Sequence, residues 1–384
     1  MTGANNPGAN NPGAGRPLGK LAVVLLNLGG PDGPHAVEPF LFNLFNDPAI
    51  VRLPGWMRWP VAKLISRRRA PVAREIYGHL GGGSPLLANT KAQAAALEAA
   101  LKEAAAEVRT FIAMRYWHPQ SDAAAREVKE FSPERVLLLP LYPQYSTTTT
   151  ASSAAAWNHA AKSAGLSAPT QLICCYPTEP GFIAALTDLA RAALAEARRQ
   201  APNAKPFVLF SAHGLPEKIV KTGDPYASQV SATAQAVAAQ LELKRGDPVG
   251  GGQGEESAGK GSLGEWNIGF QSRVGPVRWI RPWTDELIVQ AAEEKRAIVV
   301  LPIAFVSEHS ETLVELDIEY RKLAQKHGAP AYVRAPTVST HPAFIGGLAN
   351  ILRDTLRDNR TLVPFGSCGP DCRQCPCRLA AKEI

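Results

Sequence analysis

The sequence predicts an α/β protein of doubly wound topology, in which two similar domains each contain a parallel sheet flanked by helices. Short apolar runs alternate with alanine-rich stretches of helical length, as in chains built from strand–helix–strand units. Most of these runs are apolar throughout, which is typical of parallel strands covered on both faces. Three runs of the first half also resemble three runs of the second half, which indicates an internal duplication.

Eight runs qualify as strands, four in each domain. The sequence places them at residues 21–29, 109–117, 135–143, 170–177, 206–214, 267–273, 297–305 and 331–338. Helices are expected between them, at residues 87–108, 181–199 and 224–243. The matched runs are LLNLGGP with LFSAHGLP, FIAMRYWHP with IGFQSRVGP, and LLLPLYPQYS with VVLPIAFVSEHS.

The boundaries between these parts follow from changes in composition. The expected order is a disordered tail at 1–18, a first domain at 19–177, a second domain at 178–340, a helix packing back on the core at 341–364 and a cysteine-rich tail at 365–384. The first tail repeats GANNP and lacks an apolar run. Residues 246–265, rich in glycine and charge, are expected to form a flexible insertion in the second domain.

Composition excludes several classes of protein. The 384 residues are 45% hydrophobic and 20% charged, which fits a soluble globular chain. We find no signal peptide and no run of the roughly 18 apolar residues that span a bilayer. Six cysteines without an export signal indicate a reducing compartment, so the chain is expected in the cytoplasm. The net charge is +7, but no nucleic-acid motif accompanies it, so nucleic acid is not an expected partner.

The stretch PIAFVSEHSETLVELDIEY, residues 302–320, concentrates acids in this basic chain. On a helix its glutamates share one face, namely Glu308, Glu311, Glu315 and Glu319. A solvated helix face is one interpretation. The absence of interleaved lysine or arginine, and the apolar run AIVVLPIAF that leads into it, favour a functional one.

Polar residues stand where the expected strands end. They are Asn27, Arg115, Tyr142, His213, Ser272, Glu308 and His309. Ligands of open parallel sheets bind at the carboxyl ends of strands, so a cleft between the two domains is the expected site. The usual pKa of histidine suits His213 to proton transfer near neutrality, although a lone histidine in such a position is more often a hydrogen-bonded structural one. Arginines beside aromatic residues suit a flat apolar ligand with carboxylates at its edge, or else ordinary surface and core positions.

Seven motifs together resemble the signatures of the ferrochelatase family, in the same order and spacing. They are LLNLGGPD, GGGSPL, MRYWHP, PLYPQYS, SAHGLP, QSRVGP and PIAFVSEHSETLVELDIEY, and the resemblance covers about residues 21–362. The chain resembles in particular the bacterial type that has a cysteine-rich tail. It implies two Rossmann-like, chelatase-type halves around a cleft. The implied activity is insertion of Fe²⁺ into protoporphyrin IX with release of two protons, the terminal step of heme biosynthesis.

Other functions remain open at this point. One is a chelatase that uses coproporphyrin or another tetrapyrrole, or that inserts cobalt. Another is a non-catalytic heme or iron–sulfur sensor that keeps the fold. A basic scaffold that binds membrane or nucleic acid would leave the acidic stretch unexplained.

The resemblance also implies roles for single residues. His213 and Glu311 are expected to be catalytic, on opposite faces of the porphyrin. A path for Fe²⁺ or for protons is implied for His213, Glu308, His309, Glu311, Glu315 and Glu319. Porphyrin contacts are implied for Asn27, Arg115, Tyr116, Tyr142, Thr148, Tyr176, Ser272, Trp279 and Phe305. In the family the acidic row lies on a helix with π-type turns, which would align its carboxylates.

Residues 40–69 mix large apolar side chains with a basic end. An ordinary helix pair is one interpretation, whereas in the family this region forms an apolar lip over the cleft. Trp56, Met57 and Trp59, with the arginines at 67–69, would suit a peripheral contact with anionic lipid at the inner face of the membrane. The chain is expected to be a monomer or a homodimer.

Four cysteines crowd the C-terminal tail as C-x₃-C-x₂-C-x-C, at Cys368, Cys372, Cys375 and Cys377. Soft ligands this close favour a [2Fe–2S] cluster over structural Zn²⁺ or free thiols. Some family members take one cluster ligand from the loop after PQYS. Here that loop has Thr147 and no cysteine, so that scheme does not transfer. Cys174 and Cys175 end an apolar run and are expected to be buried structural thiols.

Overall fold

The computed structural model describes residues 18–245, 265–273, 275, 277–366, 369 and 371–377. The tail expected at 1–18 and the insertion expected at 246–265 therefore lie almost wholly outside the described residues, and so does Cys368.

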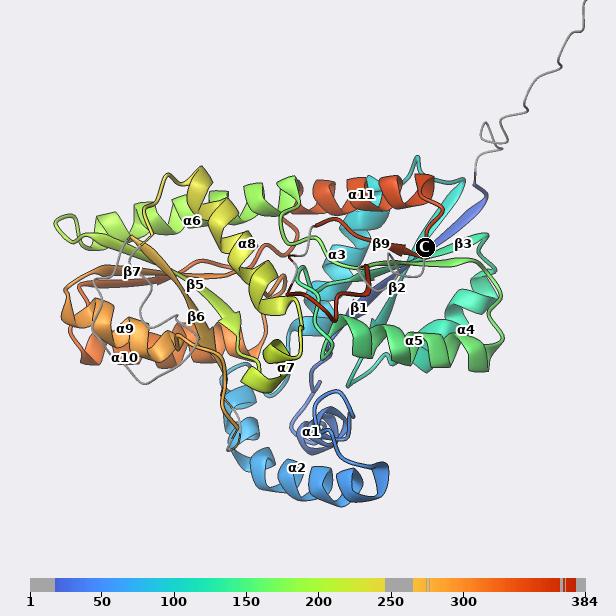
Figure 1. The fold of residues 1–384 in the computed structure, drawn as a ribbon, viewed down its shortest axis with the longest axis horizontal. Coiled ribbons are helices and arrows are strands. Elements are labelled where there is room, and N and C mark those ends of the chain that lie inside the picture. The colour runs from blue at the N-terminus through green and yellow to red at the C-terminus, as the bar shows by residue number, and fades with distance from the viewer. Residues whose placement is uncertain are drawn as a thin grey trace, which may run out of the picture.

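The described strands form two parallel sheets (Figure 1). The first has the order β2-β1-β3-β4-β9, with bounds Glu107–Met114, Lys20–Asn27, Arg135–Pro140, Thr170–Ile173 and Leu362–Val363. The second has the order β6-β5-β7-β8, with bounds Trp266–Gln271, Pro206–His213, Ala297–Pro302 and Ala331–Arg334. In both sheets the first strand along the chain lies between the second and the third. This shared order confirms the predicted α/β fold of two similar halves.

Helices occupy the connections. They are α1 (Val37–Phe45), α2 (Gly55–Gly78), α3 (Leu86–Ala100), α4 (Ser121–Phe131), α5 (Thr150–Ala164), α6 (Pro180–Gln200), α7 (Glu217–Lys221), α8 (Tyr226–Gln240), α9 (Thr284–Glu293), the π-helix η1 (Glu311–Glu319), α10 (Tyr320–Lys326) and α11 (Pro342–Arg357). The helix expected at 87–108 was too long. It ends at Ala100, because the backbone from Glu107 onward pairs with β1 as strand β2.

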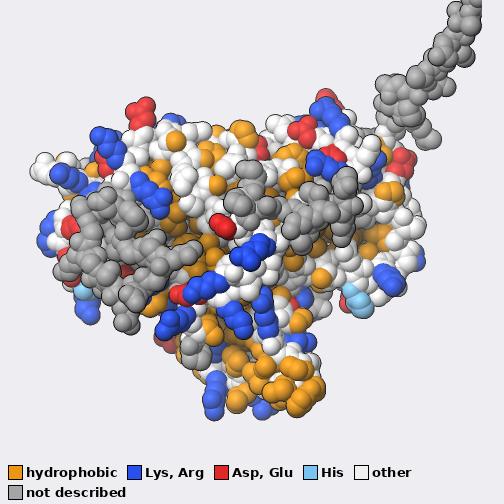
Figure 2. All heavy atoms as spheres, in the orientation of Figure 1, with side chains coloured by type: hydrophobic (Ala, Val, Ile, Leu, Met, Phe, Trp, Pro, Cys, Tyr) orange, Lys and Arg blue, Asp and Glu red, His pale blue; other side chains and the backbone are white. Residues whose placement is uncertain are grey.

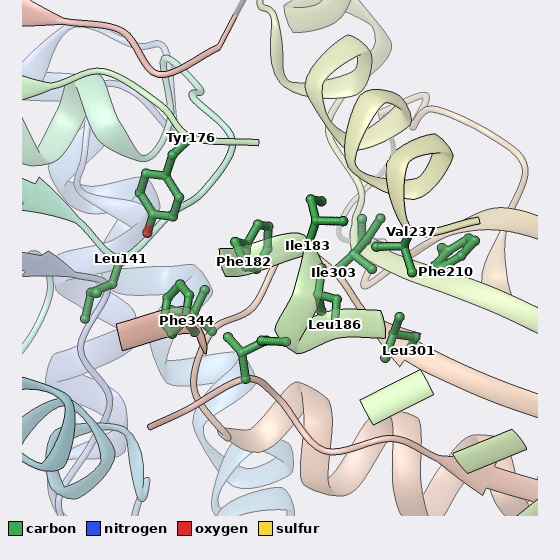
Figure 3. Close-up of a cluster of buried hydrophobic side chains, with 14 of the residues drawn as sticks. Leu141, Tyr176, Phe182, Ile183, Leu186, Phe210, Val237, Leu301, Ile303 and Phe344 are labelled. Atoms are coloured by element: carbon green, nitrogen blue, oxygen red, sulfur yellow. The ribbon is translucent and has the colours of Figure 1, made fainter. Parts of the chain in front are cut away.

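One continuous apolar core joins the two halves. Helices α6 and α11 pack end to end along one face of both sheets (Figure 1), and their aromatic side chains meet there. The Phe182 and Phe344 rings lie 5.7 Å apart between centroids. Figure 3 shows them beside Leu141 of the first half and Ile303 of the second. Because this core is shared, the carboxyl ends of both sheets are held at a fixed separation.

Buried amides add directional contacts between the halves. Gln93 on α3 donates from Nε2 to the carbonyls of Val306 (2.9 Å) and Ser339 (3.1 Å), and its Oε1 accepts from the Ser307 hydroxyl at 2.9 Å. Gln144 donates to the Ile303 carbonyl at 3.1 Å. These bonds fix the segment that follows β7 against the first half, and that segment leads directly into η1.

Helices α1 and α2 project from the body of the molecule (Figure 1). Their contact includes an edge-to-face pair between Phe42 and Trp59, 5.9 Å apart. Trp56 and Trp59 are 79% and 56% exposed, and Figure 2 shows an apolar patch at this end. None of the described helices combines the length and apolar character needed to cross a membrane.

Candidate functional site

The site is centred on His213 and Glu311. His213 is the last residue of β5, and Glu311 is the first of η1, which follows the neighbouring strand β7. The His213 Nε2 lies 3.8 Å from the Glu311 Oε1, and the two side chains are 35% and 25% exposed. His213 Nδ1 lies 2.6 Å from the Gly214 carbonyl, which can only accept, so Nδ1 carries a proton and Nε2 faces the carboxylate. Trp279 packs against the imidazole with 6.1 Å between ring centroids.

Residues 311–319 form a π-helix, as the family resemblance implied, whereas Glu308 lies before it and does not share its face. Its wider turn keeps glutamates four residues apart on one side, and one hydroxyl bridges two of them. Ser272 Oγ lies 3.0 Å from Glu311 Oε2 and 2.5 Å from Glu315 Oε2. Ser272 stands directly after β6 with a φ of +64°, a left-handed conformation that non-glycine residues adopt at a cost. The strained turn therefore directs the hydroxyl into the row.

The two bridged carboxyls titrate differently. Burial alone would raise the pKa of Glu311, but the nearby His213 and His309 more than offset it, so the pKa lies below its usual value. Burial and the neighbouring Glu311 carboxylate raise the pKa of Glu315. Neighbouring acids with separated pKa values suit the stepwise transfer of protons or the handling of a cation.

His309 lies beside this pair and is nearly buried. Its Nδ1 donates to the Ser307 carbonyl at 3.1 Å, which leaves Nε2 as the acceptor, and its ring lies 4.4 Å from the Phe305 ring. Burial lowers the pKa of His309, although Glu311 partly offsets the effect. His309 is thus a neutral imidazole near pH 7, with a lone pair available to a proton or a metal ion.

The remaining members of the acidic row lie apart from the central pair. Glu308 forms an ion pair with Arg334, with 2.9 Å between Oε1 and Nη1, and accepts the Thr337 backbone N–H at 3.0 Å. Its carboxylate is therefore engaged by Arg334 and Thr337, and its place in the path stays a prediction. Glu319 is exposed at the end of η1, whereas Glu311 and Glu315 are partly buried.

Sequence analysis missed several residues that border the central pair. Gln271 donates to Glu311 Oε2 at 3.4 Å, and Tyr320 donates to Glu315 Oε1 at 2.9 Å. Tyr226 hydrogen-bonds the backbone of His213, and burial raises its pKa. Tyr77 of α2 hydrogen-bonds Ser310, the residue before Glu311, and burial raises its pKa to about 12. Gln271 and Tyr320 carried a signal, since Gln271 opens the motif QSRVGP and Tyr320 closes the acidic stretch.

The first half contributes a second polar group at the end of β2. Arg115 pairs with the buried Asp47, with 2.8 Å between Nη2 and Oδ2, and its Nε donates to Ser152 at 2.7 Å. Tyr142 shares a hydroxyl contact of 3.5 Å with Ser153. Burial raises the pKa of Tyr142, and Ser153 and Arg115 partly offset it, which places Arg115 beside this phenol.

Four of the expected porphyrin contacts are buried in the protein. Tyr176 is fully buried and donates to the Pro140 carbonyl at 2.8 Å, and Tyr116 is 1% exposed. Asn27 donates to Thr90 at 3.0 Å. Thr148 is 6% exposed. In this structure these four side chains expose little surface, and their contact with a porphyrin stays a prediction.

The cysteines form a group that the sequence did not predict. The Sγ atoms of Cys174, Cys375 and Cys377 all lie within 4.8 Å of one another. Cys372 is buried but lies outside this group. The adjacent thiols of Cys175, Cys375 and Cys377 raise the pKa of the Cys174 thiol. Three soft donors facing one another fit a metal or cluster site, and Cys174, expected to be structural, supplies one of them from the end of β4.

Comparisons with known proteins agree with this geometry. The family model of Ferrochelatase matches residues 20–356. A Ferrochelatase of Caulobacter vibrioides is 49% identical over 367 residues, covering 94% of this chain and 99% of that protein. A Ferrochelatase of Phenylobacterium zucineum is 48% identical, covering 94% and 98%, and one of Pelagibacter ubique is 44% identical, covering 93% and 98%. The matched residues include both His213 and Glu311. The chain belongs to the ferrochelatase family.

Proposed function

We propose that this enzyme inserts Fe²⁺ into protoporphyrin IX, releasing two protons and forming protoheme, as the terminal step of heme biosynthesis. The observation that carries the proposal is the partly exposed His213–Glu311 pair, 3.8 Å apart, at the start of a row of carboxylates. Metallation must remove two pyrrole protons and admit a divalent cation. A base with an unpaired nitrogen beside an ionised carboxylate supplies groups for both tasks.

His213 and Glu311 have different roles in the reaction. Because His213 Nδ1 already donates to Gly214, its Nε2 can receive a pyrrole proton and pass it toward Glu311. Glu311, whose pKa is low, is ionised at neutral pH and can stabilise the imidazolium that forms. Trp279 and Phe305 provide flat apolar surfaces beside these groups, which suit a macrocycle held bent, with its nitrogen lone pairs turned outward.

The acidic row continues this path. Glu315, whose pKa is raised, accepts a proton more readily than Glu311 does, and it lies one hydroxyl away from it. Glu319 is open to solvent. Oxygen and imidazole donors bind Fe²⁺ weakly enough to release it, so the same residues suit delivery of the ion. The row is therefore proposed to move cations between solvent and the porphyrin.

The test is anaerobic Fe²⁺ insertion, followed as loss of porphyrin fluorescence, with protoporphyrin IX and coproporphyrin III side by side. We expect fast metallation of protoporphyrin. Faster metallation of coproporphyrin would mean that the substrate is another tetrapyrrole than protoporphyrin IX. Tight binding without metallation of either porphyrin would leave a heme or iron–sulfur sensor.

A second proposal concerns a resident cofactor. Cys174, Cys375 and Cys377 would hold a [2Fe–2S] cluster, or alternatively Zn²⁺, with a fourth thiol from Cys175 or from elsewhere in the tail. The group would tie the tail to the end of β4. Metal analysis and the visible spectrum of purified protein distinguish the cluster from Zn²⁺.

The apolar patch on α2 supports a third proposal. Trp56, Met57 and Trp59, with the arginines at 67–69 on the same helix, would insert at the surface of an anionic bilayer. The enzyme would then act from the cytoplasm at the inner face of the membrane, as a monomer or homodimer, where an apolar porphyrin is delivered. Vesicle sedimentation tests the contact.

A further inference from the structure

Asp47 has a bonding pattern that its place between α1 and α2 does not require. It is 3% exposed, and its Oδ2 accepts three donors: the Tyr116 hydroxyl at 2.8 Å, the Ser152 hydroxyl at 2.5 Å and the Arg115 Nη2 at 2.8 Å. Its Oδ1 accepts the Ala49 backbone N–H at 2.8 Å. Both oxygens of this buried carboxyl group are therefore hydrogen-bonded.

Three elements meet at this carboxylate. Arg115 and Tyr116 follow β2, Ser152 belongs to α5, and Asp47 itself follows α1. Ser152 completes a triangle, since it donates to Asp47 and accepts from Arg115 Nε. The Arg115 guanidinium also lies 5.0 Å above the Tyr116 ring. Arg115 is thus held from two edges and one face, with little freedom to rotate.

The fixed guanidinium retains capacity for a ligand. Of the five N–H groups of an arginine, Arg115 uses one at Nε and one at Nη2, which leaves three. Its side chain is 23% exposed, at the carboxyl end of the first sheet beside Tyr142. A planar fork with free N–H groups matches a carboxylate in geometry. Because Asp47 neutralises its charge, orientation matters more here than net attraction.

We propose that Asp47 is a positioning residue that orients Arg115 toward a carboxylate at the edge of the porphyrin. The inference rests on the proposed function, since it takes a porphyrin carboxylate as the ligand. It also gives α1 and α2 a role inside the pocket, because the segment that joins them carries Asp47. Movement of these helices would change the orientation of Arg115.

The test compares protoporphyrin IX with its dimethyl ester, both in the same detergent. Binding is measured by fluorescence titration without iron, and metallation is measured separately. Asp47→Asn cannot satisfy Ala49 and three interior donors together. We expect its Kd and KM for the dicarboxylate to rise about tenfold with kcat within about twofold, and its values for the ester to stay unchanged.

Further variants separate positioning from folding. Ser152→Ala removes one edge of the triangle and should raise the same Kd about threefold. Asp47→Asn should add nothing to Arg115→Met, because Asp47 acts through Arg115. Glu98→Gln is the matched control. Glu98, on α3, accepts two bonds from Thr110 of β2, the strand that Arg115 follows. It should leave both substrates unaffected.

The outcomes are distinct. Equal losses on the acid and the ester, additive losses in the double variant, or unchanged binding in Asp47→Asn and Ser152→Ala would each overturn the inference. If Asp47→Asn fails to fold, Ser152→Ala decides alone. Wild-type protein that binds the acid but metallates nothing would defeat the proposed function, while the binding comparison would still test Asp47.

Discussion

The His213 imidazole faces the Glu311 carboxylate at 3.8 Å, because β5 and β7 pair in parallel and end at the same edge of the second sheet. His213 closes the first of these strands, and the second leads through a short segment into η1. That segment is held from the first half by Gln93. The geometry of the pair is therefore set by sheet register and by one buried amide, and both lie outside the site itself.

Glu311→Gln should lower kcat for Fe²⁺ insertion by about 10²- to 10⁴-fold while porphyrin affinity changes little. The amide keeps the size of the side chain and removes its charge, so the imidazolium at His213 loses its partner. Steady-state metallation and fluorescence titration measure the two effects. Glu319→Gln is the control, since this carboxylate is exposed, and it should lose far less activity. Comparable losses in both variants would mean that the row acts only through its total charge.

The stability of the protein should fall below pH 6.5 in part because of His309. Its pKa is lowered in the folded state by burial, so the unfolded chain binds the proton more readily. Stability from this group is present above the unfolded pKa of about 6.5 and is lost as pH falls through it. Thermal unfolding of wild type and His309→Asn between pH 5 and 8 checks this. The melting temperature of the variant should rise relative to that of the wild type as the pH falls. A difference in melting temperature that stays constant with pH would contradict the lowered pKa of His309.

Cys174→Ser should lose bound metal, even though Cys174 lies far from the tail in sequence. It contributes one of three sulfur atoms within 4.8 Å of one another. Metal content per chain and the visible spectrum measure the loss. Cys372→Ser is the informative comparison, because Cys372 is buried outside the group and should retain more metal. If Cys174→Ser keeps its full metal content and Cys372→Ser loses metal, the ligands would all come from the cysteines of the tail.

The sequence predicted the parts of this protein that depend on local pattern. Apolar runs identified all strands of both sheets except β9, which has two residues and pairs with β4 only because α11 returns the chain to the first half. The histidine and glutamate of the site stood in distinctive motifs. What could not be predicted depends on contacts distant in the chain. Asp47 has no motif, and its meaning appears only where three elements meet. Likewise, Cys174 meets Cys375 and Cys377 only because the tail returns to the end of β4.

The apolar patch of α2 should control binding to membranes. Trp56→Ser combined with Trp59→Ser removes two of the largest exposed apolar side chains and should weaken binding to anionic vesicles by more than tenfold. Sedimentation with phosphatidylglycerol vesicles measures this. Val277→Ser, at an exposed apolar position of the second half, is the control and should bind normally. Equal binding by all three proteins would leave the basic residues as the sole source of attraction.

Gln93→Leu should both destabilise the protein and slow the reaction. Leucine has similar size but leaves the Val306 and Ser339 carbonyls and the Ser307 hydroxyl without their partner. Each buried polar group left unpaired costs about 1–3 kcal/mol, so a total near 3 kcal/mol is expected once partial relaxation is allowed. The Ser307 carbonyl also fixes the His309 ring, so the loss should reach the site. Urea unfolding and kcat measure the two consequences, with Gln235→Leu, an exposed glutamine of α8, as the control. If Gln93→Leu is less stable but has normal kcat, the amide joins the halves without placing the catalytic segment.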